Sequence, residues 1–131
     1  MAVLLYASQT SSAGRKLKQI VKSLIPEEET EIYLTIDSLS RRLRQPRNNL
    51  SIAVLLAFTK KDLSDLLSIG DLFWGFRIIL ILPDREQSTI AKGHIFRPRF
   101  ITYADNNFLE VAAVLDKMLE KDKLSEEENG Q

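Results

Sequence analysis

Continuous runs of apolar residues are spaced along the whole chain. Four of strand length cover residues 3–7, 32–36, 52–58 and 78–82, and a weaker fifth covers residues 100–103. Strands with one face in water alternate apolar and polar residues, whereas strands covered on both faces are apolar throughout. The pattern therefore predicts five parallel β-strands at these positions.

Helical periodicity fills the segments between the runs. The first helix is indicated by apolar residues at i, i+3, i+4, i+7 and i+8, namely Leu17, Ile20, Val21, Leu24 and Ile25, and Pro26 ends it. After the third run, the segment from Thr59 to Asp62 has the form of a capping box, which begins a helix with Leu63 and Leu66 on one face. Shorter helices are expected at residues 38–45 and 87–92.

The last helix has the clearest apolar stripe. Asn107 is placed to cap it with Glu110 three positions later, and the stripe consists of Phe108, Val111, Ala112, Leu115 and Leu119. From residue 120 to residue 131 Leu124 is the single apolar residue, so we expect a flexible acidic tail there.

Five successive β-α units predict one α/β domain over residues 1–119. Right-handed crossovers place helices on both faces of a parallel sheet, which gives a three-layer αβα sandwich. The expected strand order is 2-1-3-4-5, the flavodoxin-like arrangement.

Composition excludes several classes of protein. The chain has 131 residues, 44% of them apolar, and its 18 basic and 18 acidic residues cancel to a net charge of zero. A globular core is expected, and nucleic-acid binding through bulk positive charge is not. Without cysteine there are no disulfides, thiolate zinc sites or cysteine nucleophiles.

No membrane-spanning or secretory segment is expected. The longest apolar stretch, residues 66–82, is interrupted by Asp71, Arg77 and two glycines, and it falls short of about 20 apolar residues. The first run has no basic residue before it, so it does not resemble a signal peptide. The expected location is cytoplasmic.

Ligands of open α/β sheets bind beyond the carboxyl ends of the strands. The candidate residues there are Ser8, Thr10, Ser11 and Ser12 after the first strand, Thr59 after the third and Asp84 after the fourth. Hydroxyl groups at a helix start could hold a phosphate or a flavin phosphate, and they are equally suited to capping. Asp84 is the acid expected to face the cleft, or else a turn residue.

The chain resembles the receiver domain of two-component signalling. The resemblance depends on length, on the five β-α units and on residues 107–119, which are similar to the final helix of many receivers. Receivers carry paired acids after the first strand and a phosphoacceptor aspartate after the third, whereas this chain has Ala7 and Phe58 there and no acid in residues 3–14 or 48–61. Pro83 and Tyr103 likewise stand near the receiver hydroxyl and lysine positions. We therefore expect a non-enzymatic interaction or regulatory module, without aspartate phosphorylation, magnesium or another cofactor.

A second resemblance is to the phosphate loop of flavodoxin. It covers residues 6–12, lacks the glycine of that loop, and is accompanied by no obvious aromatic pair for a flavin ring. It implies the alternative of a small flavin- or nucleotide-binding protein that uses residues 8–12.

Two further regions are candidate interaction surfaces. Arg41, Arg42 and Arg44 belong to a basic cluster on the first two helical segments, which we expect to be adjacent. The cluster could dock an acidic partner or form a solvated face balanced by Glu31 and residues 27–29; without interleaved aromatic residues, nucleic acid is not expected.

The other candidate surface precedes and includes the fifth strand. His94, Arg97 and Arg99 lie there, and the receiver resemblance implies a homodimer or partner surface formed by the fourth helix, fifth strand and fifth helix. The aromatic segment at residues 70–76 is expected to close the core or to mark a partner surface.

Overall fold

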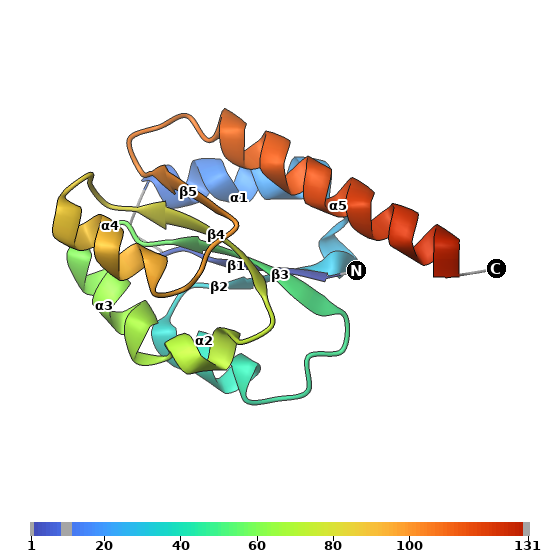
Figure 1. The fold of residues 1–131 in the computed structure, drawn as a ribbon, viewed down its shortest axis with the longest axis horizontal. Helices are drawn as coiled ribbons and strands as arrows, with labels where there is room; N and C mark the ends of the chain where they lie inside the picture. Colours follow the sequence, from blue (N-terminus) through green and yellow to red (C-terminus); the bar gives the residue numbers. More distant parts are fainter. Residues whose placement is uncertain (1, 9–11, 130–131) are drawn as a thin grey trace.

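The protein is built around a single parallel sheet. A computed structural model describes the backbone of residues 2–8 and 12–129 and the side chains of residues 2–8 and 12–121. The strands are β1 (Ala2–Tyr6), β2 (Thr30–Tyr33), β3 (Leu50–Leu56), β4 (Arg77–Leu82) and β5 (Phe100–Tyr103). All neighbouring strands are parallel and their order is β2-β1-β3-β4-β5, as the sequence predicted (Figure 1).

A helix follows each strand. The helices are α1 (Ser12–Leu24), α2 (Ile36–Leu43), α3 (Lys60–Ser68), α4 (Gln87–His94) and α5 (Leu109–Asn129), and two 3₁₀ turns, η1 (Glu27–Glu29) and η2 (Gly70–Phe73), precede β2 and β4. The predicted fold class is therefore confirmed: an α/β sandwich with a flavodoxin-like sheet.

The two faces of the sheet carry separate cores. Along β1, Val3 and Leu5 point toward α1 and α5, whereas Leu4 and Tyr6 point toward α2, α3 and α4. Side chains alternate between faces along every strand, so both faces are apolar and the strands read as continuous apolar runs.

The first two helices lie on opposite faces of the sheet, and the expectation that they are adjacent is wrong. Packing of α1 is with α5, whereas residues of α2 belong to the other core (Figure 1). The cause is the strand order. The chain moves outward from β1 to β2 and then back across β1 to β3, and right-handed crossovers in opposite directions place their helices on opposite faces. The basic residues of α1 and α2 therefore do not form one patch.

The second strand ends earlier than the apolar pattern predicted. Thr35 is the N-cap of α2, and its hydroxyl oxygen accepts a hydrogen bond from the backbone N–H of Ser38 at 3.2 Å. This cap turns Ile36 into the first helical residue, so the run at 32–36 divides between a strand and a helix. An N-cap hydroxyl determines where a helix begins, and the pattern of apolar residues does not show that position.

The last helix continues to Asn129. Residues 120–129, for which the sequence predicted a tail, are therefore helical. Flexibility of that segment in solution, and the domain limit at residue 119, stay predictions. None of the helices within residues 2–8 and 12–129 combines the length and apolar character needed to cross a bilayer.

Candidate functional site

The carboxyl edge of the sheet is where the sequence placed its candidate ligands, and two of them are helix-capping or turn residues. Thr59 is the N-cap of α3: its hydroxyl oxygen accepts from the N–H of Asp62 at 3.1 Å, and the Asp62 carboxylate accepts from the N–H of Thr59 at 3.2 Å. This reciprocal pair is the predicted capping box. Both side chains therefore accept backbone hydrogen bonds at the start of α3.

Asp84 serves the turn between β4 and α4. Its carboxylate accepts a hydrogen bond from the N–H of Glu86 at 3.0 Å. A hydrogen bond from the Thr89 side chain, followed by the one from Glu86, holds the pKa of Asp84 below its ordinary value. The interpretation of Asp84 as a turn residue is confirmed, because these contacts order the entry into α4.

Two ion pairs cross the carboxyl edge above β3, β4 and β5. The Lys60 ammonium lies 2.6 Å from the Glu86 carboxylate and joins the starts of α3 and α4. The Arg85 guanidinium lies 2.5 Å from the Asp105 carboxylate and 4.3 Å from the ring centre of Tyr103, so it joins the loops after β4 and β5. These pairs raise the pKa of Lys60 and lower the pKa of Asp105. Each stays charged at neutral pH, and neither is suited to proton transfer.

Burial affects the last residue of β1. Tyr6 is almost fully buried and lies on the α3 side of the sheet. Burial, with the negative charges of Asp62 and Asp65, raises its pKa to about 12. Tyr6 is therefore a neutral phenol throughout the physiological range.

The hydroxyl-rich loop after β1 is partly described. Ser8 is half-buried and Ser12 is the exposed first residue of α1, whereas Thr10 and Ser11 lie outside the described residues. Ser8 lines a groove of about 240 Å³ between α1 and the β1–β2 edge. Its floor is apolar and its α1 wall carries Arg15 and Lys18. The groove suits a small anion, but sites for ligands of cofactor size are usually 300–1,000 Å³.

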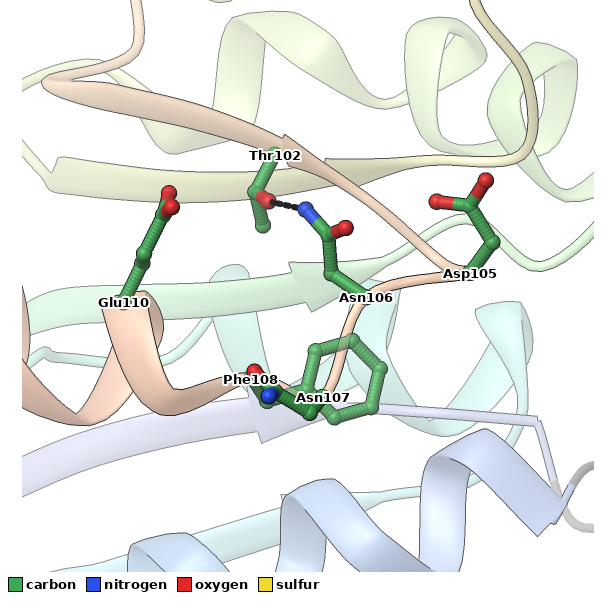
Figure 2. A pocket seen from close by; sticks show the side chains of 6 residues that line it. All are labelled: Thr102, Asp105, Asn106, Asn107, Phe108 and Glu110. Carbon is green, nitrogen blue, oxygen red and sulfur yellow. Dashed lines mark hydrogen bonds between the residues drawn. The ribbon is translucent and has the colours of Figure 1, made fainter.

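A second hollow of about 430 Å³ lies where β5 turns into α5, and Figure 2 shows the side chains around it. They are Thr102, Asp105, Asn106, Asn107, Phe108 and Glu110. The Asn106 amide donates a hydrogen bond to the buried Thr102 hydroxyl at 2.7 Å, which fixes the loop against β5 (Figure 2).

Backbone geometry at the same loop places an aromatic ring in the core. Phe108 has a φ of 65°, in the left-handed region that bulky residues rarely adopt, and its side chain is 1% exposed. The Asn107 side chain accepts from the N–H of Leu109 at 3.1 Å and so takes part in starting α5. The hollow is lined by one continuous segment, and the Thr102, Asn106 and Asn107 side chains are engaged in hydrogen bonds within it.

The three arginines predicted on the second helix differ in their surroundings. The Arg42 side chain is 11% exposed, and its guanidinium lies 2.6 Å from the Glu31 carboxylate. Arg41 forms an exposed pair with Asp37 at 2.9 Å, and Arg44 is exposed at the end of α2. Arg42 is therefore a structural residue, and the predicted balance by Glu31 is confirmed.

His94, Arg97 and Arg99 are exposed around the connection from α4 to β5. The aromatic segment divides: Phe73 is buried, whereas Trp74 is 83% exposed. Phe73 therefore belongs to the core, as the first interpretation expected, whereas a partner surface at Trp74 stays a prediction. Alternation alone would not separate them, because η2 and the following loop have no regular period.

Several pairings were not visible in the sequence. Lys60 and Glu86 are 26 residues apart, and Arg85 and Asp105 are 20 residues apart. They meet because parallel strands bring the loops after β3, β4 and β5 to one edge. The strand order could have indicated shared edges, but no local pattern specifies which side chains pair.

Comparison with known proteins gives one structural likeness. No family model and no curated protein sequence matches the chain. A solved structure from Burkholderia pseudomallei K96243, described as a "putative pilus assembly-related protein", is similar over 92% of this chain and 88% of that chain, with a TM-score of 0.62 and 16% identity. At that identity the likeness supports the fold alone.

Proposed function

We propose that the chain is a receiver-like module that binds a protein partner and does not accept a phosphoryl group. One observation carries the proposal: the carboxyl edge lacks acids where phosphoryl chemistry needs them. Ala7 follows β1 and the half-exposed Phe58 follows β3. A methyl group and a phenyl ring supply neither a magnesium ligand nor a nucleophile.

The remaining polar groups of that edge support the proposal because they are engaged with one another. Thr59 bonds Asp62, Asp84 accepts from the Glu86 N–H, and Glu86 pairs with Lys60. Among the residues that the structure describes, there is also no group of three acidic or histidine side chains placed to hold a metal ion. These mutual contacts favour a binding module over one that performs phosphoryl chemistry at this edge.

Phosphorylation is the direct test. Full-length protein is incubated with acetyl phosphate and magnesium, and its intact mass is measured, with beryllofluoride and magnesium as a parallel thermal-shift assay. We expect no added phosphoryl mass and an unchanged melting temperature. A stoichiometric aspartyl phosphate would overturn the proposal.

The groove beside Ser8 favours one alternative, a small flavin- or nucleotide-binding protein, since Arg15 and Lys18 provide positive charge next to a helix start. Flavin mononucleotide and adenosine nucleotides distinguish the two functions. A ligand at 100 times its Kd stabilises a fold by about 2.7 kcal/mol, which a thermal shift detects. We expect no shift, and a colourless purified protein.

A further inference from the structure

The amino edge of the sheet, opposite the edge considered so far, carries an exposed aromatic ring among arginines. The connections into β3, β4 and β5 meet there, because these strands are neighbours in the sheet. Figure 1 shows the connections into β3 and β4 at the same end of the sheet as the N-terminus. We define the amino-edge patch as Arg47, Trp74, Ile95, Arg97 and Arg99.

Contacts between buried rings hold the members of the patch together. Phe73 and Phe96 meet edge to face with 6.1 Å between ring centres. Their exposed neighbours along the chain are Trp74, which is 83% exposed, and Ile95, which is 68% exposed. Two large exposed apolar residues thus stand next in the chain to the two rings of one fixed aromatic pair.

The Arg47 side chain is built into the same surface. Its guanidinium donates a hydrogen bond to the backbone carbonyl of Trp74 and lies 4.5 Å from the ring centre of Phe76. Gly75, with a φ of 87°, makes room for it, because a Cβ there would come within 2.7 Å of the guanidinium. The Arg47 guanidinium therefore fixes the loop that carries Trp74 and places an ordered positive charge beside it.

Arg97 is held in a conformation that costs stability. Its φ is 51°, and its N–H donates to the carbonyl of His94 at 3.0 Å, closing the end of α4. Glycine or asparagine usually occupies such a position. A strained, charged position of this kind is a candidate for a binding role.

The charge around the patch is one-sided. Residues 44–61 and 87–100 contain no acid, and Asp71 is the one acid in the connection from α3 to β4. By contrast, the connection into β2 carries Glu27, Glu28 and Glu29. At the amino edge, the connections into β3, β4 and β5 therefore carry four arginines, Arg44, Arg47, Arg97 and Arg99, against the single acid Asp71, and this excess of positive charge attracts carboxylates.

We propose that the amino-edge patch binds an acidic polypeptide segment, with Trp74 and Ile95 contacting an apolar side chain of that segment and Arg97 and Arg99 its carboxylates. Tryptophan and arginine are the residue types that dominate binding energy at protein interfaces. One exposed indole on short loops gives no track for successive bases, so a polypeptide fits better than a nucleic acid. The inference depends on the proposed function, because it names the surface and partner chemistry of that module.

The test is selection of a phage-displayed library of random 12-residue peptides on the full-length protein. We expect enriched peptides with two or more Asp or Glu residues around an apolar residue. Trp74 is the single tryptophan of the chain, so binding at the patch should shift its fluorescence emission. Substitution of Trp74→Ala, or of Arg97→Glu together with Arg99→Glu, should weaken the selected peptides at least tenfold, measured with dye-labelled peptide.

The matched control reverses two exposed charges on the other face, Lys16→Glu with Lys22→Glu in α1, and should leave affinity within twofold. Circular dichroism checks that each variant is folded. Recovery of no peptides, or of peptides without acidic bias, overturns the inference, as does binding that the patch substitutions leave unchanged.

Other occupants give distinct results, and each would overturn the inference. A Trp74 emission shift that depends on protein concentration indicates a second copy, and an equal shift with oligo(dT) indicates nucleic acid. Peptides that bind elsewhere would refute the patch and leave the proposed interaction module intact. An aspartyl phosphate or a bound flavin would refute the proposed function and leave the patch measurable.

Discussion

Arg42 of α2 donates two hydrogen bonds to Glu31 of β2, from Nε to Oε1 at 2.6 Å and from Nη2 to Oε2 at 3.3 Å. The same guanidinium donates to the carbonyls of Pro46 and Arg47, and Tyr33 adds a hydrogen bond to Glu31 at 2.7 Å. One side chain of the basic cluster thus fastens an edge strand, a helix and the loop into β3.

Replacing Arg42 should destabilise the fold. Arg42→Gln leaves Glu31 partly buried without its charge partner, and hydrogen bonds to charged groups contribute about 1.5–3 kcal/mol. We expect a loss of about 2 kcal/mol in the free energy of unfolding, measured by urea denaturation. Arg41→Gln is the control, because the Arg41–Asp37 pair is exposed and such pairs contribute about 0–1 kcal/mol. Equal losses in the two variants would contradict this role.

The Arg42–Glu31 pair also makes the free energy of unfolding depend on pH. Burial alone would raise the pKa of Glu31, but the hydrogen bonds from Arg42 and Tyr33 lower it below its ordinary value of 4.5. A lowered pKa in the folded state gives stability that is present above the unfolded pKa and lost as pH falls through the folded one. Urea denaturation between pH 6 and pH 3 should therefore show a flatter decline in Arg42→Gln than in wild type. A parallel decline would contradict the assignment.

The sheet could be predicted well from the sequence, because strands buried on both faces need apolar residues at successive positions and so form continuous apolar runs. Strand β5 has the predicted limits, and the Thr59–Asp62 capping box is where the pattern placed it. Side-chain partners were not predictable, because they depend on how loops meet after the sheet has formed. The sequence placed Arg42 in a candidate docking cluster, because no local pattern indicates that Glu31, eleven residues away, lies beside it.

Thr59→Ala should reveal a capping role at the carboxyl edge. The alanine variant loses the hydroxyl that accepts from Asp62 N–H, and such caps contribute about 1 kcal/mol. We expect a thermal-denaturation loss of about that size, and recovery in Thr59→Ser, which keeps the hydroxyl. Unchanged stability in the alanine variant would show that the capping box contributes nothing.

Two phenylalanines at the carboxyl edge should respond differently to substitution. Phe108 is 1% exposed and Phe58 is 42% exposed. Phe108→Ala removes a fully buried ring and should cost about 3–5 kcal/mol. Phe58→Ala should change the free energy of unfolding by about 0.5 kcal/mol or less. A large loss from Phe58→Ala in denaturant titration would mean that Phe58 is a core residue.

Alkaline titration tests the buried Tyr6 and the partly buried Tyr33. Burial raises the pKa of both Tyr6 and Tyr33 to about 12, with Asp62 and Asp65 adding to it for Tyr6 and Glu31 for Tyr33. Stability that depends on their neutral form should be complete below pH 10 and lost as pH rises toward 12. Phenolate absorbance should show one fewer late-ionising tyrosine in Tyr6→Phe than in wild type. An equal number in the two proteins would contradict the assignment for Tyr6.

The left-handed conformation of Arg97 separates stability from binding. A non-glycine residue there costs about 1–2 kcal/mol, whereas glycine costs about 0.5–1 kcal/mol in chain entropy. Arg97→Gly should therefore raise the free energy of unfolding by about 0.5 kcal/mol. Arg97→Ala keeps the strain without the charge, so it should match wild type in chemical denaturation. Both variants should weaken acidic peptides, because both remove the guanidinium. If Arg97→Gly lost stability, the arginine would be a folding residue, and its strained position would no longer argue for a binding surface.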